Sequence, residues 1–189
     1  MKRALILAAL LLTACQEEKQ DISPVELTET AVGHYCQMEL LEHPGPKAQV
    51  HLEGAAGKPL FFSQVRDAVA YSRLPEQDGV ILAIYVNDMG AAGATWDIPG
   101  TKNWIAADTA HYVVGSEVEG GMGAPELVPF ADPEKAAAFA ATKGGTVVQL
   151  AEVPDAEVIA PVDQSSHDGM EGDADFNKRL KSLSERIGG

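Results

Sequence analysis

The segment AQVHLEGAAGKPLFF, residues 48–62, contains the local pattern on which the fold prediction depends. Residues 48–52 have the composition of a strand, and the glycines of EGAAG at 53–57 predict a turn, because glycine readily adopts tight-turn conformations. Residues 59–62 predict a second strand. The segment therefore predicts a hairpin.

A helix and a third strand are expected directly after this hairpin. Ser63 is a suitable helix N-cap, and residues 64–72 place Val65 and Val69 on one helical face by their spacing. The continuous apolar run at 80–86 predicts a buried strand. The first half of the chain is thus expected to form a strand, strand, helix and strand.

The same order of elements is repeated in the second half of the chain. Gly57 and Pro59 are matched by Gly123 and Pro125. The predicted elements of this second copy are a strand at 110–118, a turn at 119–123, a strand at 126–130, a helix opened by Asp132-Pro133 and stopped by Gly144-Gly145, and a strand at 146–150. We therefore predict an α+β fold of two related strand-strand-helix-strand halves.

The N-terminus has the features of an export signal. Lys2 and Arg3 precede the apolar run at 4–12, and LTAC ends at Cys15, as in bacterial lipoprotein signals. A membrane span needs roughly 20 apolar residues, which this run does not reach. We therefore predict a signal peptide at 1–14, a lipid on Cys15, and export to the oxidising periplasm.

The remaining chain divides into three parts by composition. Residues 15–31 are polar and predict a lipidated tether, and residues 32–153 predict the folded domain. Residues 154–189 predict an acidic flexible tail with a short C-terminal helix. An apolar stripe on that helix is expected from Phe176, Leu180, Leu183 and Ile187.

The net charge excludes some partners. The chain carries −14 at pH 7, and loss of Lys2 and Arg3 with the signal peptide takes it to −16. Such acidity argues against nucleic acid and against electrostatic docking on anionic lipid, so membrane attachment is expected from the lipid alone. It is compatible with a basic partner surface or with solubility alone.

Once Cys15 carries a lipid, Cys36 is the single remaining thiol. It can be a buried apolar side chain, an intermolecular disulfide, a catalytic nucleophile or a metal ligand. If the segment is extended, Cys36 and Met38 share one face, and a thiolate with a thioether selects Cu(I) among common metals. Met122, between glycines in the turn at 120–123, is either a second thioether ligand or a side chain packed over a hairpin end.

Other histidines and methionines are weaker candidates. His34 is two residues before Cys36 and can supplement a metal site or activate the thiol as a nucleophile. Met89 is expected to pack, and His167 and Met170 in the flexible tail are weak candidates for transient copper contact only. The remaining assignments are an exposed His43, a structural His111, and packing of Trp96 and Trp104 between the halves.

In order and spacing, these motifs resemble the NosL family of copper chaperone lipoproteins. The resemblance covers most of the mature domain and rests on Cys15, Cys36-Gln37-Met38, Asp88, Trp104, Ala106, Ala107, Ala110-His111-Tyr112-Val113, Met122-Gly123, Phe130, Ala136, Phe139 and Gly144-Gly145. The chain departs from the family at Gln37, where the usual Cys-Gly-Met motif has glycine.

The resemblance implies a Cu(I) carrier with two similar αβ halves, in a fold likened to that of organomercurial lyase. It implies Cys36, Met38 and Met122 as the copper ligands and an ABC-type copper-site assembly transporter and nitrous oxide reductase as partners. No bond of a substrate is changed, so the chain is not expected to be an enzyme. The alternatives are periplasmic copper sequestration and a thiol enzyme using Cys36. Gln16 replaces the aspartate that often retains lipoproteins in the inner membrane, which favours the outer membrane.

Overall fold

The computed structural model describes residues 19–159. The predictions for the signal peptide, Cys15, His167, Met170 and the C-terminal helix lie outside the described residues. The described chain contains two antiparallel sheets, with a helix packed on each. No helix in residues 19–159 has the length and apolar character to cross a membrane.

The first half forms a four-stranded sheet and one helix. Its elements are β1 (Ala48–Leu52), β2 (Leu60–Phe62), α2 (Val65–Arg73), β3 (Ile81–Asn87) and β4 (Trp104–Ala106). The strand order is β2-β1-β3-β4, and each neighbouring pair is antiparallel. The predicted strand, turn, strand, helix and strand are all present, and β4 is an addition to them.

The second half repeats this arrangement. Its elements are β5 (His111–Val114), β6 (Val128–Phe130), α3 (Pro133–Lys143) and β7 (Thr146–Gln149), in the order β6-β5-β7. In both halves the first strand of the unit lies between the second and the third, so the predicted repeat is confirmed at the level of topology. Three short helical segments complete the described chain: η1 (Leu40–Glu42), η2 (Leu150–Glu152) and α4 (Asp155–Val158).

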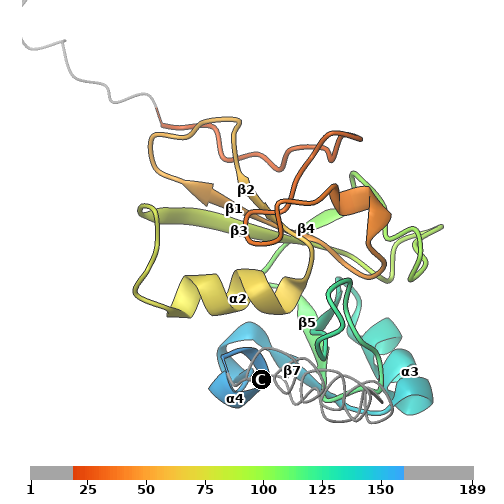
Figure 1. Cartoon of the computed structure of the whole chain (residues 1–189). Coiled ribbons are helices and arrows are strands. Elements are labelled where there is room, and N and C mark those ends of the chain that lie inside the picture. Colours follow the sequence, from red (N-terminus) through yellow and green to blue (C-terminus); the bar gives the residue numbers. More distant parts are fainter. Residues whose placement is uncertain (1–18, 160–189) are drawn as a thin grey trace, which may run out of the picture. The chain divides into compact units, whose positions relative to one another are not determined.

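The main core joins the two halves. α2 lies between the four-stranded sheet and α4 (Figure 1), and its apolar face is buried at Val65 and Val69. Tyr112 and Leu127 of the second half belong to the same buried cluster. Burial of apolar surface stabilises a fold by about 25 cal/mol per Å². The shared core is therefore the main source of stability between the two halves.

The two helices start differently. Asp132 accepts a hydrogen bond from the Glu134 amide at 2.8 Å and Pro133 occupies the first turn of α3, as the sequence predicts. Ser63 does not cap α2, because the helix starts one residue later and Gln64 holds the N-cap position. The Gln64 amide donates to the Ala124 carbonyl instead, so a contact between the halves replaces the local cap.

The segment before the domain is more ordered than a tether. The amide of Val25 donates to Gln49, the amide of Leu27 donates to the Thr101 carbonyl, and Leu27 is buried with Leu40. The described part of the predicted tether therefore lies against the first sheet. Composition alone could not show this, because these contacts join residues far apart in the chain.

Candidate metal centre

Cys36 lies in a tight turn, which we call the Cys36 turn (residues 33–38). The amide of Gln37 donates to the Gly33 carbonyl at 2.9 Å, and the amide of Gly33 donates to the Met38 carbonyl at 3.0 Å. Gln37 has a φ of 56°, in the left-handed region. The condition of an extended segment, under which Cys36 and Met38 would share one face, is therefore not met. The alternation that was to place Cys36 and Met38 on one face does not apply here.

Glycine at position 33 makes room for the thiol. A Cβ built on Gly33 would lie 2.4 Å from Cys36 Sγ, much closer than real Cβ contacts. Cys36 is half-buried and its thiol is free. Any side chain at position 33 would therefore displace the sulfur.

Gln37 closes the turn with its side chain. Its amide donates to the His34 carbonyl at 2.6 Å and to the Gly33 carbonyl at 3.3 Å. A left-handed conformation costs a non-glycine residue roughly 1–2 kcal/mol, and these two bonds offset part of that cost. The departure from glycine at this position thus has a local explanation.

Both predicted thioether ligands are exposed. Met38 is 41% exposed and Met122 is 44% exposed, although burial of a methionine side chain is favourable. The Met122 side chain is therefore accessible to solvent at its loop. Met89, by contrast, packs with the second-half cluster around Phe130, as expected.

The loop that carries Met122 packs closely against other segments of the chain. We call residues 119–125 the Met122 loop. A Cβ on Gly120 would lie 2.3 Å from Gln64 Nε2 and 2.4 Å from Glu126 Oε2, so both polar groups pack directly against this glycine. Gly121 lies in the same way against His43 and the Pro44 carbonyl. Glycines are needed here because two other segments approach the loop backbone closely.

Glu126 links this loop to α2. Its Oε1 accepts hydrogen bonds from the amides of Arg66 at 3.0 Å and Leu127 at 2.9 Å. Arg66 is in the first turn of α2, so a carboxyl group of the second half caps a helix of the first. Burial raises the pKa of Glu126 to about 8, against the opposing effect of these two amides.

Lys47 lies where these segments meet. Its side chain is buried, and its ammonium donates to the Pro44 carbonyl at 2.9 Å and to the Gly45 carbonyl. The charges of Glu126 and Cys36 both act on it, while burial lowers its pKa to about 8. Lys47 therefore ties down residues 44 and 45, beside the point at which Gly121 of the Met122 loop lies against His43 and Pro44.

The histidine predictions have different outcomes. His43 is half-buried beside Gly121, so the prediction of an exposed turn residue is wrong. Its Nε2 is buried without a hydrogen-bond partner in the described chain. His34 Nε2 lies 3.4 Å from Asp78, and its ring contacts Tyr35, Phe62 and Tyr71. This nitrogen is engaged with Asp78 rather than positioned as a base for Cys36.

The two tryptophans pack on different clusters. Trp96 packs with the second-half cluster and lies against Gly45, whose added Cβ would be 3.1 Å from the indole, so it bridges two regions as expected. Trp104 packs on the cluster of Leu27, Ala31 and Leu40 instead. His111 pairs in β5 opposite Phe130, in agreement with a structural role.

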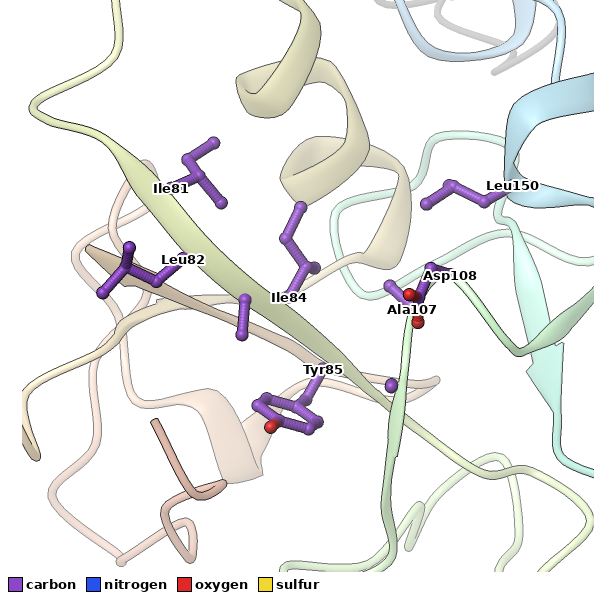
Figure 2. Close-up of a pocket in the computed structure, with 9 residues that line it drawn as sticks. Ile81, Leu82, Ile84, Tyr85, Ala107, Asp108 and Leu150 are labelled. Atoms are coloured by element: carbon purple, nitrogen blue, oxygen red, sulfur yellow. The ribbon is translucent and has the colours of Figure 1, made fainter. Parts of the chain in front are cut away.

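The pocket drawn in Figure 2 does not offer an alternative soft-metal site. This pocket of about 360 Å³ has β3 residues on one side and Ala107, Asp108 and Leu150 on the other (Figure 2). Its single charged group is Asp108, and its lining contains neither sulfur nor imidazole. Within residues 19–159, no three His, Cys, Asp or Glu side chains gather as a metal site. Methionine, the predicted partner of Cys36, is not among those residue types.

Sequence analysis overlooked Gly33, Gln64, Lys47 and Glu126. Gly33 is close to Cys36 in sequence, but nothing local indicates that its missing side chain accommodates a sulfur. Lys47 and Glu126 are ordinary polar residues until the halves pack together. One available signal is that Glu126 is an isolated carboxyl between Pro125 and the apolar run at 127–130.

Comparison with known proteins identifies relatives over most of the chain. The family model for NosL matches residues 24–158. The copper-binding lipoprotein NosL of Achromobacter cycloclastes is 58% identical over 191 residues, which cover 100% of this chain and 98% of the relative. The copper-binding lipoprotein NosL of Stutzerimonas stutzeri is 32% identical over 168 residues, covering 87% of this chain and 85% of the relative.

A solved structure supports the fold. The crystal structure of the copper chaperone NosL from Shewanella denitrificans superposes with a TM-score of 0.64 at 29% sequence identity, covering 70% of this chain and 96% of the other. The predicted α+β fold is therefore confirmed. The likeness to organomercurial lyase stays a prediction.

Proposed function

The chain belongs to the NosL family, and we propose that it is a lipid-anchored, periplasmic Cu(I) chaperone that delivers copper for assembly of nitrous oxide reductase. Relatives named as copper-binding lipoproteins and a copper chaperone support the copper-binding part of this proposal. Delivery to nitrous oxide reductase follows from the family resemblance.

The observation that carries the proposal is a free thiol together with two exposed thioethers, Met38 two residues after the thiol and Met122 on a loop that lies against His43 and Pro44. Cys36 supplies the one anionic ligand, and Met38 and Met122 supply neutral sulfur. Thiolate and thioether ligands favour Cu(I), whereas zinc takes more thiolates or imidazoles and calcium takes oxygen. Copper is the cargo in this account and reaches the site from solution or from a donor.

Delivery fits this site better than storage. Both thioethers face solvent, so a ligand of an acceptor protein can approach copper before the donor ligands leave. A storage protein needs more sites or a closed one. Periplasmic copper sequestration is the second candidate function, and an affinity much tighter than that of any acceptor would favour it.

Attachment and partners complete the proposal. A lipid on Cys15 would hold the chain at a membrane, and the outer membrane is the predicted location. The partners implied by the family are an ABC-type copper-site assembly transporter and the reductase. The net charge of −14 suits an acceptor with a basic rim.

A catalytic role finds no support at the thiol. The relatives are named for binding and chaperone functions, in agreement with the prediction that the chain is not an enzyme. In addition, His34 Nε2 lies beside Asp78.

A Cu(I) titration tests the proposal. The chain with Cys15→Ser, which leaves Cys36 as the single thiol, is titrated anaerobically against a colorimetric Cu(I) chelator. We expect one equivalent to bind, with no measurable competition by Cys36→Ser and weaker binding by Met38→Leu and Met122→Leu. Met89→Leu is the matched control, because Met89 packs in a cluster away from the thiol.

Two results would contradict the proposal. One is failure of the parent chain to compete with the chelator at all, and the other is an affinity for Cu(I) that is the same with and without the Cys36 thiol. Loss of affinity in Met89→Leu equal to that in Met122→Leu would reject the assigned ligand set.

A further inference from the structure

The first part of β3 is apolar and yet largely uncovered. The sequence predicts that the apolar run at 80–86 is a buried strand, but Val86 is its one fully buried residue. Val80 is 59% exposed and Leu82 is 38% exposed, although burial of aliphatic side chains is favourable. Neighbouring apolar side chains that are exposed in this way are typical of an interaction surface.

This part of β3 also has an unpaired edge. β1 pairs with β3 along most of its length, whereas β4 pairs only with residues 85–87. The chain turns away from β3 after Ala107, whose amide donates to the Ile84 carbonyl at 2.9 Å. Within residues 19–159, no strand therefore pairs with residues 81–83 on the side away from β1. We call residues 81–83 the free edge.

The free edge lines the pocket of about 360 Å³ that is drawn in Figure 2. The opposite side of this pocket is formed by residues 106–108 and by Leu150. Ile81 and Ile84 point to one side of the strand and pack against the main core, whereas Leu82 points to the other side (Figure 2). A chain placed along the free edge would therefore meet apolar side chains on both sides of β3.

Asp108 gives this pocket a negative charge. Its side chain is exposed, it takes part in none of the ion pairs of residues 19–159, and the pocket lining contains no lysine, arginine or histidine. The whole chain carries a net charge of −14. A ligand with a cationic side chain is therefore favoured here over an acidic one.

A second copy of the chain fits this edge less well than a single extended peptide. Pairing of β3 with β3 of another copy would bring two acidic chains together, each with its own Asp108. In addition, the register between β1 and β3 shifts between His51 and Leu52, and such a bulge keeps the regular part of an edge short. A short edge inside a pocket accommodates one extended segment more easily than the edge of a second sheet.

We propose that the free edge of β3 is a docking site for an extended peptide segment of a basic partner protein. The segment adds as a strand beside residues 81–83, so its backbone bonds to the edge and its alternate side chains lie on the two sides of β3. Apolar residues of the segment contact Ile84, Leu150 and Leu82, and a lysine or arginine pairs with Asp108.

This docking site is separate from the candidate metal centre. The His34 amide in the Cys36 turn donates to the Phe61 carbonyl of β2 at 2.6 Å, and β2 lies at the opposite edge of the sheet from β4. The inference therefore goes beyond the proposed function and does not depend on copper. Its test is carried out without copper, so the result is independent of the Cu(I) titration.

The test first selects a peptide and then locates it. A phage-displayed library of random linear peptides is panned on the full chain with Cys15→Ser, and the most enriched peptide is synthesised with a fluorescent label. Fluorescence anisotropy measures its affinity, and amide hydrogen exchange followed by NMR locates it. Because alternate amides of a strand point to one edge, at least one amide of residues 81–83 should exchange about tenfold more slowly with peptide bound.

Two variants change the proposed contacts, and each has a matched control. Leu82→Lys should lower the affinity for the peptide at least about tenfold, and Asp108→Lys about threefold. Ile98→Lys and Asp97→Lys make the same changes at an exposed apolar and an exposed acidic residue outside this pocket, and both should bind like the parent. Circular dichroism verifies each fold, and Asp108→Lys decides with the exchange data if Leu82→Lys does not fold.

Several results would overturn the inference. These are a library without an enriched peptide, peptide affinity unchanged by both variants of the pocket, and slower exchange only outside the free edge. Dimerisation of the parent that is abolished by Leu82→Lys would assign the edge to a second copy. Slow exchange of residues 81–83 in the peptide-free chain, unchanged on dilution, would show that the edge is already covered within the chain.

Discussion

Two hairpin connections in this molecule share a sequence pattern and differ in use. The connection between β1 and β2 contains EGAAGKP at 53–59, and the connection between β5 and β6 contains EGGMGAP at 119–125. The glycines of the first have free space around them, since a Cβ on Gly54 or Gly57 would meet nothing within 4 Å. The second presents Met122 and is in contact with α2 and residues 43–44.

The difference comes from a few residues. Pro59 leads directly into β2, whereas Pro125 is followed by Glu126 and Leu127 before β6 starts. Both of these extra residues are buried, and Glu126 caps α2. A repeated unit thus places a methionine at a defined position through a carboxyl group that its other copy lacks.

The largest expected effect is on the pH dependence of the free energy of unfolding, and it comes from the ionisable carboxyl group of Glu126. Burial raises its pKa from 4.5 to about 8, so the folded chain retains the proton to higher pH than the unfolded chain. The stability from this group is fully present below pH 4.5 and is lost as pH rises through about 8. Between pH 5 and 8 the free energy of unfolding should fall by up to about 4 kcal/mol through this group.

Urea denaturation at pH 5, 6, 7 and 8 measures this dependence. In Glu126→Gln the amide mimics the protonated carboxyl group, so most of the fall with pH should disappear. An equal fall in the variant would show that Glu126 does not cause the pH dependence and would contradict a raised pKa for this carboxyl group.

The next effect concerns the glycines at the second position of each pattern. Gly120→Ala places a methyl group against Gln64 and Glu126 and should cost about 3 kcal/mol, with weaker Cu(I) binding because the Met122 loop moves. Gly54→Ala is the matched change in the other connection. It should cost only about 1 kcal/mol, from its φ of 78°, and should not alter copper affinity. Equal costs in urea denaturation would contradict the proposed anchoring.

Exchanging the residues at the fourth position of the two patterns tests whether the two connections differ in copper binding. Met122→Ala should lower Cu(I) affinity at least about tenfold, equivalent to about 1.4 kcal/mol. Ala56→Met puts a methionine at the fourth position of the first connection, away from Cys36. This change should not raise the affinity for Cu(I). A gain of affinity in Ala56→Met would show that any exposed methionine binds copper in this assay.

The smallest effect is expected at Gln37. Two of the three sulfurs at the site are followed by a residue with positive φ, which is Gln37 at 56° after Cys36 and Gly123 at 73° after Met122. Gln37→Gly removes the strain and two side-chain hydrogen bonds together, so stability should change by less than about 1 kcal/mol. A loss above 2 kcal/mol would indicate that the amide holds the Cys36 turn more firmly than its contacts suggest.

The sequence was sufficient to predict the repeated αβ unit, because hydrophobic periodicity and turn residues are local signals. The cap of α3 was predicted for the same reason, whereas the cap of α2 was not, because Glu126 reaches it from the other half. The shape of the Cys36 turn also escaped prediction. It depends on a left-handed Gln37, a conformation that sequence patterns assign to glycine.

The candidate site was likewise predicted only in part. Cys36, Met38 and Met122 were selected by residue type and by family resemblance, and the exposure of both methionines agrees with their selection. Lys47, Gln64 and Glu126 were not selected, since their importance arises only when the two halves bury them at a common junction.

The central claim is that one Cu(I) is bound by Cys36 and by two of the five methionines in the chain. The most direct measurement is NMR of the chain labelled with ¹³C at the methionine methyl groups, recorded before and after one equivalent of Cu(I). We expect the Met38 and Met122 signals to shift while those of Met89 and Met170 stay in place. Unchanged Met38 and Met122 signals, or a shift at Met170 instead, would contradict it.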